Sequence, residues 1–149
     1  MTDNHTTRRN HQAGYTLLEL LVVLTIIGLI AAFAVPQAAR LLSGAKSSST
    51  ESQIQKLAGI VELYHLDVGS YPTTRQGLKA LVERPSGVDN WNGPYLANFK
   101  ALIDPWGTPY QYRSPAGRVP FAIASMGADK TEGGTGDASD INSENIIAQ

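Results

Sequence analysis

The sequence predicts an α+β protein: a long N-terminal α-helix packed on a small antiparallel β-sheet, with an ordered αβ loop between them and a C-terminal loop. Two observations carry this prediction. Helical patterning extends from about residue 15 to residue 68, and short strand patterns follow at 109–113 and 119–125. Helices and antiparallel strands that are segregated along the chain are typical of α+β domains.

The first half of the predicted helix is an apolar run from Leu17 to Val35, broken by a single charge at Glu19. At about 1.5 Å rise per residue, this run spans most of the roughly 30 Å hydrocarbon core of a bilayer. Arg8 and Arg9 precede it, so the N-terminus is expected in the cytoplasm and the C-terminal part across the membrane. A carboxylate at membrane depth is costly, which makes Glu19 a candidate functional residue. The alternative is a Glu19 solvated by lipid headgroups at the interface.

The second half of the helix continues past Pro36, since proline is tolerated within membrane helices. Gly69 provides a C-terminal stop. Apolar residues recur three and four apart on one face, which indicates an amphipathic helix that packs under a small domain. These residues are Ile54, Leu57, Val61, Tyr64 and Val68.

After the helix, Thr73 and Gln76 fit a capping box, which predicts a short helix that ends before Pro85. Residues 86–105 read as an ordered loop without periodicity. Aromatic side chains are expected to anchor this region by packing, rather than to bind a ligand. They are Trp91, Tyr95, Phe99 and Trp106.

Two strands are predicted at Pro109–Arg113 and Val119–Ser125, joined by a Ser-Pro-Ala-Gly turn at 114–117. So small a hairpin needs the amphipathic helix to cover one face. A third strand is expected near Ile141 to Ile147.

Composition excludes several functions. The chain has no cysteine, so it can form no disulfide, thiolate zinc site or thiol nucleophile. The net charge of −1 gives no indication of nucleic-acid binding. His65 is the only histidine outside the N-terminal leader, and we expect it to be a half-exposed structural residue. Neither a catalytic triad nor a histidine zinc site can be assembled in the domain, so we predict that the protein is not an enzyme.

The C-terminal loop is the better candidate site. Asp129, Asp137 and Asp140 are hard oxygen donors in a glycine-rich stretch, and calcium takes six to eight oxygens from flexible loops of this kind. The spacing does not fit an EF-hand, because Thr131 and Gly133 stand at the third and fifth positions. A solvated acidic tail is the alternative, and composition alone does not decide between the two.

The stretch Gly14-Tyr15-Thr16-Leu17-Leu18-Glu19-Leu20 closely resembles the prepilin processing motif. The resemblance implies cleavage after Gly14 by a prepilin peptidase and N-methylation of Tyr15. It divides the chain into a cytoplasmic leader (1–14), a transmembrane and polymerisation helix (15–36) and a periplasmic globular domain (37–149). Glu19 becomes the fifth mature residue, and the new amine of Tyr15 on another subunit becomes its expected partner in a filament core.

Further segments resemble the major pseudopilins of type II secretion, the general secretion pathway G family. The resemblance implies a pilin-like fold and a subunit that leaves the inner membrane to polymerise with itself into a periplasmic filament. That filament drives exoproteins through an outer-membrane secretin, with minor pseudopilins and an inner-membrane assembly platform as further partners. The matching segments are Tyr71–Thr74, Gln76–Leu78, Ala80–Leu81, Gly93–Leu96, Asp104–Tyr110 and Ser125–Asp129.

In that family the C-terminal loop binds calcium through aspartates and backbone carbonyls. The resemblance places Asp129 and Asp140 at ligand positions, and leaves Asp137 and the carbonyls of Ser125 and Met126 as further candidates. The sequence departs from the family in three places. Lys130 replaces the usual glycine, Ser139 stands where some members have a second acid, and no tryptophan follows the Asp-Ile pair at 140–141.

Two other functions share parts of this pattern. A type IV pilin for adhesion or motility has the same first segment, but pilins commonly close a C-terminal loop with a disulfide, which this chain cannot form. A single-pass membrane protein with a small binding or catalytic domain would keep its N-terminus. The mass of the mature chain separates the latter from a processed subunit that begins at methylated Tyr15.

Overall fold

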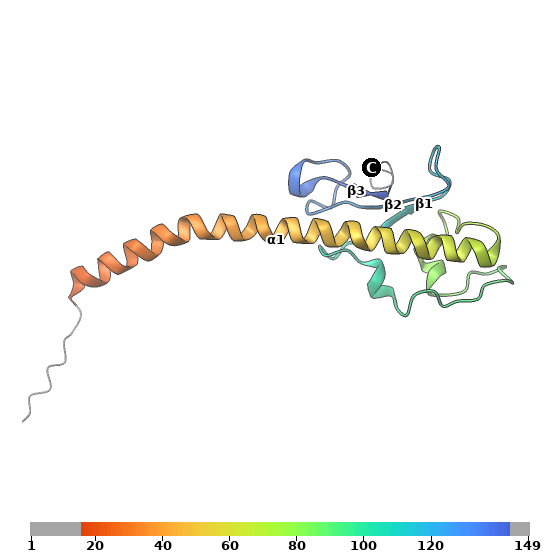
Figure 1. Cartoon of the computed structure of the whole chain (residues 1–149), viewed down its shortest axis with the longest axis horizontal. Helices are drawn as coiled ribbons and strands as arrows, with labels where there is room; N and C mark the ends of the chain where they lie inside the picture. Colours follow the sequence, from red (N-terminus) through yellow and green to blue (C-terminus); the bar gives the residue numbers. More distant parts are fainter. Residues whose placement is uncertain (1–15, 144–149) are drawn as a thin grey trace, which may run out of the picture. The chain divides into compact units, whose positions relative to one another are not determined.

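The computed structural model describes residues 16–143, and Figure 1 follows the chain from the long helix α1 to the strands β1–β3. The chain divides into two compact units between Arg40 and Leu41. Helix α1 (Leu17–Val68) contributes to both. Its end agrees with the prediction, because Gly69 adopts φ +85° and its N–H donates to the His65 carbonyl at 2.8 Å.

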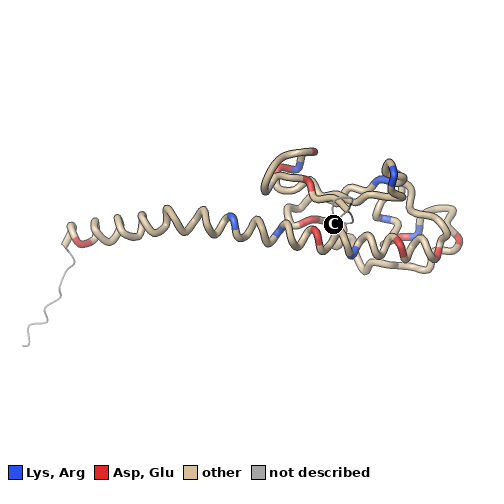
Figure 2. The backbone as a smooth tube through the Cα atoms, turned by 45° about the horizontal axis from the view of Figure 1, so that its top comes forward, with Lys and Arg blue, Asp and Glu red and all other residues tan. Residues whose placement is uncertain are grey.

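In the first unit, α1 is apolar on all sides. Its most hydrophobic 18-residue window has a mean hydropathy of 2.7. The helix is therefore long and apolar enough to cross a membrane. The large apolar side chains of this part are exposed, from Leu17 at 82% to Val35 at 65%. Figure 2 shows no charge along the helix between Glu19 and Arg40. A helix that is hydrophobic all round requires lipid or other helices around it.

In the second unit, β1 (Gln111–Arg113), β2 (Ala122–Ser125) and β3 (Ile141–Asn142) form an antiparallel sheet in the order β1-β2-β3. The strands lie alongside the second half of α1 (Figure 1). β2 is central: Tyr112 pairs with Ile123 on one side, and Ser125 pairs with Ile141 on the other.

The core lies between the sheet and the predicted amphipathic face of α1. The stripe residues from Ile54 to Tyr64 are at most 1% exposed, and Val68 packs against them half-buried. The face of β2 that carries Ile123 closes this core, as expected for a hairpin covered by a helix. The other buried apolar residues are Leu78, Ala80, Leu81, Leu102, Tyr110 and Phe121.

The capping box forms as predicted. The Thr73 N–H donates to Gln76 Oε1 at 2.8 Å, and the Gln76 N–H donates to Thr73 Oγ1 at 3.3 Å. The helix that follows is a single 3₁₀ stretch, η1 (Gly77–Leu81), which ends well before Pro85.

The predicted loop contains a second 3₁₀-helix, η2 (Phe99–Leu102), which periodicity did not indicate. Trp91 and Tyr95 anchor the loop, with an edge-to-face contact at 5.7 Å and a hydrogen bond from Trp91 Nε1 to the Ala80 carbonyl at 2.8 Å. The prediction for Phe99 was wrong: this ring is 41% exposed, and Leu102 is the residue of η2 that enters the core.

The strands are shorter than predicted. β2 begins at Ala122, because the preceding residues form a wide turn closed by a bridge between Ala116 and Val119. β3 covers residues 141–142, and residues 144–147 of the predicted strand lie outside the described residues.

Candidate functional site

The N-terminal end of α1 carries Glu19 in its first turn. The Glu19 N–H donates to Thr16 Oγ1 at 3.3 Å, so Thr16 caps the helix. A carboxylate in the first turn also interacts favourably with the helix dipole. The predicted processing residues Gly14 and Tyr15 lie outside the described residues.

The C-terminal loop joins β2 to β3 and contains the predicted metal ligands. Asp129 is exposed, and its Oδ1 accepts a hydrogen bond from the Thr131 N–H at 3.2 Å. Its Oδ2 lies close to Gly134, where an added Cβ would come within 3.0 Å of that oxygen and would overlap the Ala138 carbonyl. Gly134, at φ +92°, therefore lets a carboxylate and a carbonyl approach the same stretch of backbone.

Asp140 stands at the other end of the loop, directly before β3. Its Oδ2 accepts a hydrogen bond from the Gly133 N–H at 2.9 Å. Its Oδ1 is buried and has no hydrogen-bond partner among the described residues. A buried carboxylate oxygen without a partner is unfavourable, and a bound cation would satisfy it.

The remaining candidates differ in how the structure places them. Ser125 is fully buried, with its hydroxyl engaged inside the domain. Met126 is half-buried, and Gln111 Nε2 donates to its sulfur at 3.4 Å. Asp137 belongs to the short 3₁₀-helix η3 (Gly136–Ala138), but its side chain lies outside what the structure describes.

Lys130, one of the positions where the sequence departs from the family pattern, has an unusual backbone conformation. Lys130 adopts φ +60° and is the only non-glycine residue with positive φ in residues 16–143. This conformation costs an ordinary side chain about 1–2 kcal/mol, whereas glycine adopts it freely. The glycine that the resemblance leads us to expect at this position would therefore suit the backbone found here.

Among the side chains that the structure describes, which do not include that of Asp137, no three acidic or histidine groups lie so that they could hold a metal ion by themselves. Calcium in this loop would depend on backbone oxygens in addition to Asp129 and Asp140. The structure offers two carbonyls that were not predicted, Ala138 against Gly134 and Ser139 within 3.0 Å of a Cβ built at Gly127. The residues thus fit a calcium ion that takes carboxylate and carbonyl oxygens together.

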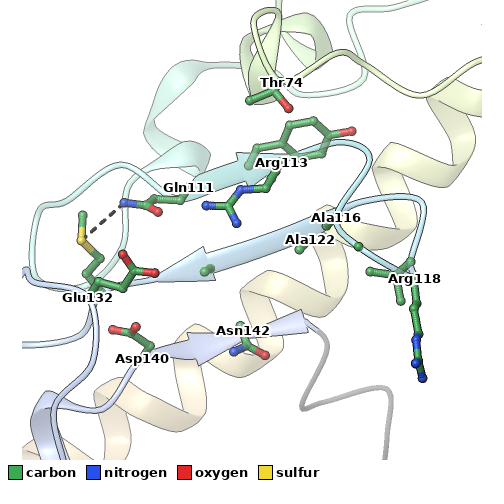
Figure 3. Close-up of a pocket in the computed structure, with 14 residues that line it drawn as sticks. Thr74, Gln111, Arg113, Ala116, Arg118, Ala122, Glu132, Asp140 and Asn142 are labelled. Atoms are coloured by element: carbon green, nitrogen blue, oxygen red, sulfur yellow. Dashed lines mark hydrogen bonds between the residues drawn. The ribbon is translucent and has the colours of Figure 1, made fainter.

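The outer face of the sheet is hollowed beside this loop. Ala122 and Ala124 are the small outward side chains of β2, and the open hollow above them has a volume of about 740 Å³. Figure 3 shows Glu132 and Asp140 near the C-terminal end of β2, and Arg113 over the sheet. Glu132, which the sequence did not indicate as a ligand, therefore adds negative charge to the hollow that Asp140 also lines.

His65 agrees with its predicted structural role. Its ring is half-buried and stacks on Tyr71, with ring centroids 4.1 Å apart and planes inclined by 16°. No aspartate, glutamate or second histidine joins it to make a set of three such groups within the described part of the chain.

Comparison with protein families gives two matches along the chain. Residues 38–144 match the family described as type II secretion system protein G. Residues 9–35 match the prokaryotic N-terminal methylation motif, which spans the predicted processing site and the apolar run.

Individual relatives agree with these matches. The type II secretion system core protein G of Pseudomonas aeruginosa is 43% identical over 138 residues, which cover 90% of this chain and 96% of the relative. The core protein G of Vibrio cholerae is 39% identical, with 91% and 93% covered. Among solved structures, the major pseudopilin from the type 2 secretion system of enterohaemorrhagic Escherichia coli superposes with a TM-score of 0.57 and 32% identity, covering 68% of this chain and 89% of that one.

Proposed function

Because this chain belongs to the type II secretion system protein G family, we propose that it is the major structural subunit of a secretion pseudopilus. A single observation carries the proposal: the N-terminal methylation motif and the protein G domain follow each other in one chain. The family is one of structural subunits, and the reading as an adhesion or motility pilin is not favoured.

We propose that the newly made subunit is inserted in the inner membrane. The apolar half of α1 crosses the bilayer once, and the second unit lies in the periplasm. A prepilin peptidase removes residues 1–14, and the amine of Tyr15 becomes methylated. Supporting this, residues 17–35 form a helix whose apolar side chains are exposed on all sides, a surface suited first to lipid and then to neighbouring helices.

Assembly is proposed to depend on Glu19. Its carboxylate lies at the start of an uncharged stretch that continues to Arg40. In a filament built from these helices, the Tyr15 amine of one subunit pairs with Glu19 of another. Breaking such a pair leaves an unpaired charge in an apolar surrounding, so the pair favours one axial register over others. Minor pseudopilins and an inner-membrane assembly platform are the further partners proposed.

Calcium is proposed as the ion of the C-terminal loop. Asp129 and Asp140, with the carbonyls of Ala138 and Ser139, would hold it, and Asp137 is a further candidate. The support is the unpartnered buried Oδ1 of Asp140 and the close backbone approach at Gly134. Once bound, calcium would neutralise the acids and tie the two ends of the loop together.

Secretion of an exoprotein in a strain that lacks this gene tests the proposed function. We expect the reporter exoprotein to accumulate in the periplasm of the deletion strain and to reach the medium again when the full chain is supplied. A chain with Gly14 replaced, which the peptidase should leave uncut, is the matched control and should not restore secretion. Normal secretion without the gene would contradict the proposal, and the mass of the mature chain reports processing independently.

A further inference from the structure

A network of buried polar side chains extends from α1 to the candidate calcium loop. Its members Thr50, Asp104, Tyr110 and Ser125 are at most 7% exposed, in a core whose other buried side chains are mostly apolar. Thr50 lies on α1, where its hydroxyl donates to the Lys46 carbonyl at 2.9 Å, and both Thr50 and the negative charge of Asp104 act on the pKa of Tyr110. Buried polar groups of this kind persist only where their hydrogen bonds are satisfied.

Asp104 is the centre of this network of buried polar side chains. Its Oδ1 accepts hydrogen bonds from the backbone N–H groups of Trp106 at 3.0 Å and Thr108 at 2.7 Å, which fixes the turn before β1. Its Oδ2 accepts a 2.6 Å hydrogen bond from Ser125 Oγ. One buried carboxylate therefore joins this turn to the last residue of β2.

Ser125 links Asp104 to the C-terminal loop. Its Oγ accepts a hydrogen bond from the Gly127 N–H at 3.3 Å, at the point where the chain leaves the sheet. Gly127 has φ +63°, and a Cβ built on it would lie 3.0 Å from the Ser139 carbonyl oxygen. Ser139 precedes Asp140, so the Ser125 hydroxyl acts on the backbone that brings both ends of the loop together.

We propose that Asp104 and Ser125 are positioning residues for calcium binding: the Asp104–Ser125–Gly127 hydrogen bonds hold the loop in the conformation that presents Asp140 and the neighbouring carbonyls. This inference rests on the calcium site proposed above. It assigns Ser125 a role through its hydroxyl, whereas the sequence suggested only its carbonyl. Hydrogen-bonding partners behind metal ligands typically change metal affinity by about 10–100-fold when removed.

The first test is calorimetric titration of the full-length chain in detergent with calcium, after removal of bound metal by a chelator. Ser125→Ala removes the hydroxyl that joins Asp104 to Gly127 and leaves every proposed ligand in place. We expect its calcium affinity to fall about tenfold.

Tyr95→Phe is the matched control. It also removes a hydroxyl that donates to a carboxylate, from Tyr95 to Asp67 Oδ2 at 2.9 Å, but in the αβ loop. Its calcium affinity should stay within about twofold of the parent chain, since small changes at remote sites are additive within a few tenths of a kcal/mol. A general loss of stability would weaken both variants alike.

The second test uses the unaltered chain and therefore does not depend on a variant that folds. Amide hydrogen exchange is measured with calcium and with chelator. Calcium should slow exchange at Thr131 and Gly133 within the loop, and also at Trp106 and Thr108, whose amides Asp104 holds. The Asn92 amide, held by Tyr95, should not change.

These outcomes separate the two proposals. If the loop amides respond to calcium but those of Trp106 and Thr108 do not, or if Ser125→Ala binds calcium as tightly as the parent chain, the positioning role is overturned and the calcium site stands. If the parent chain binds no calcium, the site and the positioning role both fall. A selective response of both sets of amides, with weakened binding in Ser125→Ala alone, supports the inference.

Discussion

The indole ring of Trp91 lies so close to Gly93 that a Cβ built on Gly93 would be 2.5 Å from the ring. The ring cannot move away freely, because its Nε1 donates to the Ala80 carbonyl at 2.8 Å. We therefore expect Gly93→Ala to lower the free energy of unfolding by about 1–3 kcal/mol, as overpacking does. Chemical denaturation of the full chain in detergent, followed by tryptophan fluorescence, measures the change.

Gly59→Ala is the matched control. Gly59 lies inside the C-terminal third of α1, and an added Cβ there meets no atom within 4 Å. Alanine in a helix interior is favoured over glycine by about 0.5–1 kcal/mol, so this variant should be slightly more stable than the parent chain. Equal stability of Gly93→Ala and the parent chain would show that the Trp91 contact is not tight.

A second prediction compares two leucines on one helix. Leu57 is fully buried in the core, whereas Leu66 is 78% exposed. Leu57→Ala leaves a cavity and should cost about 2–5 kcal/mol of unfolding free energy. Leu66→Ala should stay within about 0.5 kcal/mol of the parent chain in the same denaturation experiment. Similar losses in both variants would contradict the assignment of the buried face.

Local patterns were enough to predict the helix, its buried stripe and the capping box, because each of these depends on neighbours three or four residues apart. Gly69 and the Thr73–Gln76 pair are such local signals. For the same reason the hairpin was predicted at the right place in the chain, although β2 is shorter than expected.

Contacts between distant segments could not be read in this way. The hydrogen bond from Ser125 to Asp104 joins residues 21 positions apart, and neither residue type indicates it. Phe99 was misjudged because its place on η2 depends on how the loop packs, not on its hydrophobicity. In the loop, Asp129 and Asp140 were predicted from residue type and resemblance, but the roles of Gly134 and the Ala138 carbonyl depend on backbone conformation.

A third prediction concerns alkaline pH. Burial, together with the negative charge of Asp104, raises the pKa of Tyr110 from 10.0 to about 12, against the opposing effect of its hydrogen bond with Thr50. The unfolded chain releases this proton near pH 10 and the folded chain only near pH 12. The stability that the neutral tyrosine contributes is therefore complete below pH 10 and is lost as the pH rises toward 12.

Thermal unfolding between pH 9 and 12 measures this effect. Melting temperatures should fall across the interval, and less steeply in Tyr110→Phe, which has no proton to lose. Burial also raises the pKa of Tyr112 to about 12, so part of the slope should persist in the single variant. An identical slope in the parent chain and in Tyr110→Phe would rule out the buried neutral phenol.

Removal of calcium gives the fourth prediction. A ligand that binds only the folded state, at a hundred times its dissociation constant, adds about 2.7 kcal/mol of stability. Excess chelator should therefore lower the melting temperature of the full chain. A double variant, Asp129→Asn with Asp140→Asn, should melt at the same temperature with or without chelator. If chelator leaves the parent chain unchanged as well, the calcium site is refuted.

The fifth prediction separates two roles of Glu19. The structure places it three residues after the capping Thr16, so it belongs to the first turn of α1 regardless of any filament. Glutamine can replace glutamate in a capping box, but it cannot neutralise an amine. Glu19→Gln therefore removes the charge with little change in side-chain shape, and the backbone N–H that donates to Thr16 Oγ1 is kept in both Glu19→Gln and Glu19→Ala.

We expect Glu19→Gln and Glu19→Ala to insert into the membrane and to be cleaved after Gly14, but to form few or no filaments. Thr16→Ala is the control: it removes the hydroxyl that accepts from the Glu19 N–H at 3.3 Å, and it keeps the carboxylate. A lost cap costs about 0.5–2 kcal/mol and is tolerable in a helix held by lipid, so this variant should assemble. Mass spectrometry establishes cleavage, and electron microscopy of filaments released from the periplasm of lysed cells counts them. Normal filaments from Glu19→Gln would mean that the carboxylate serves the helix start or the membrane interface and does not pair with the Tyr15 amine.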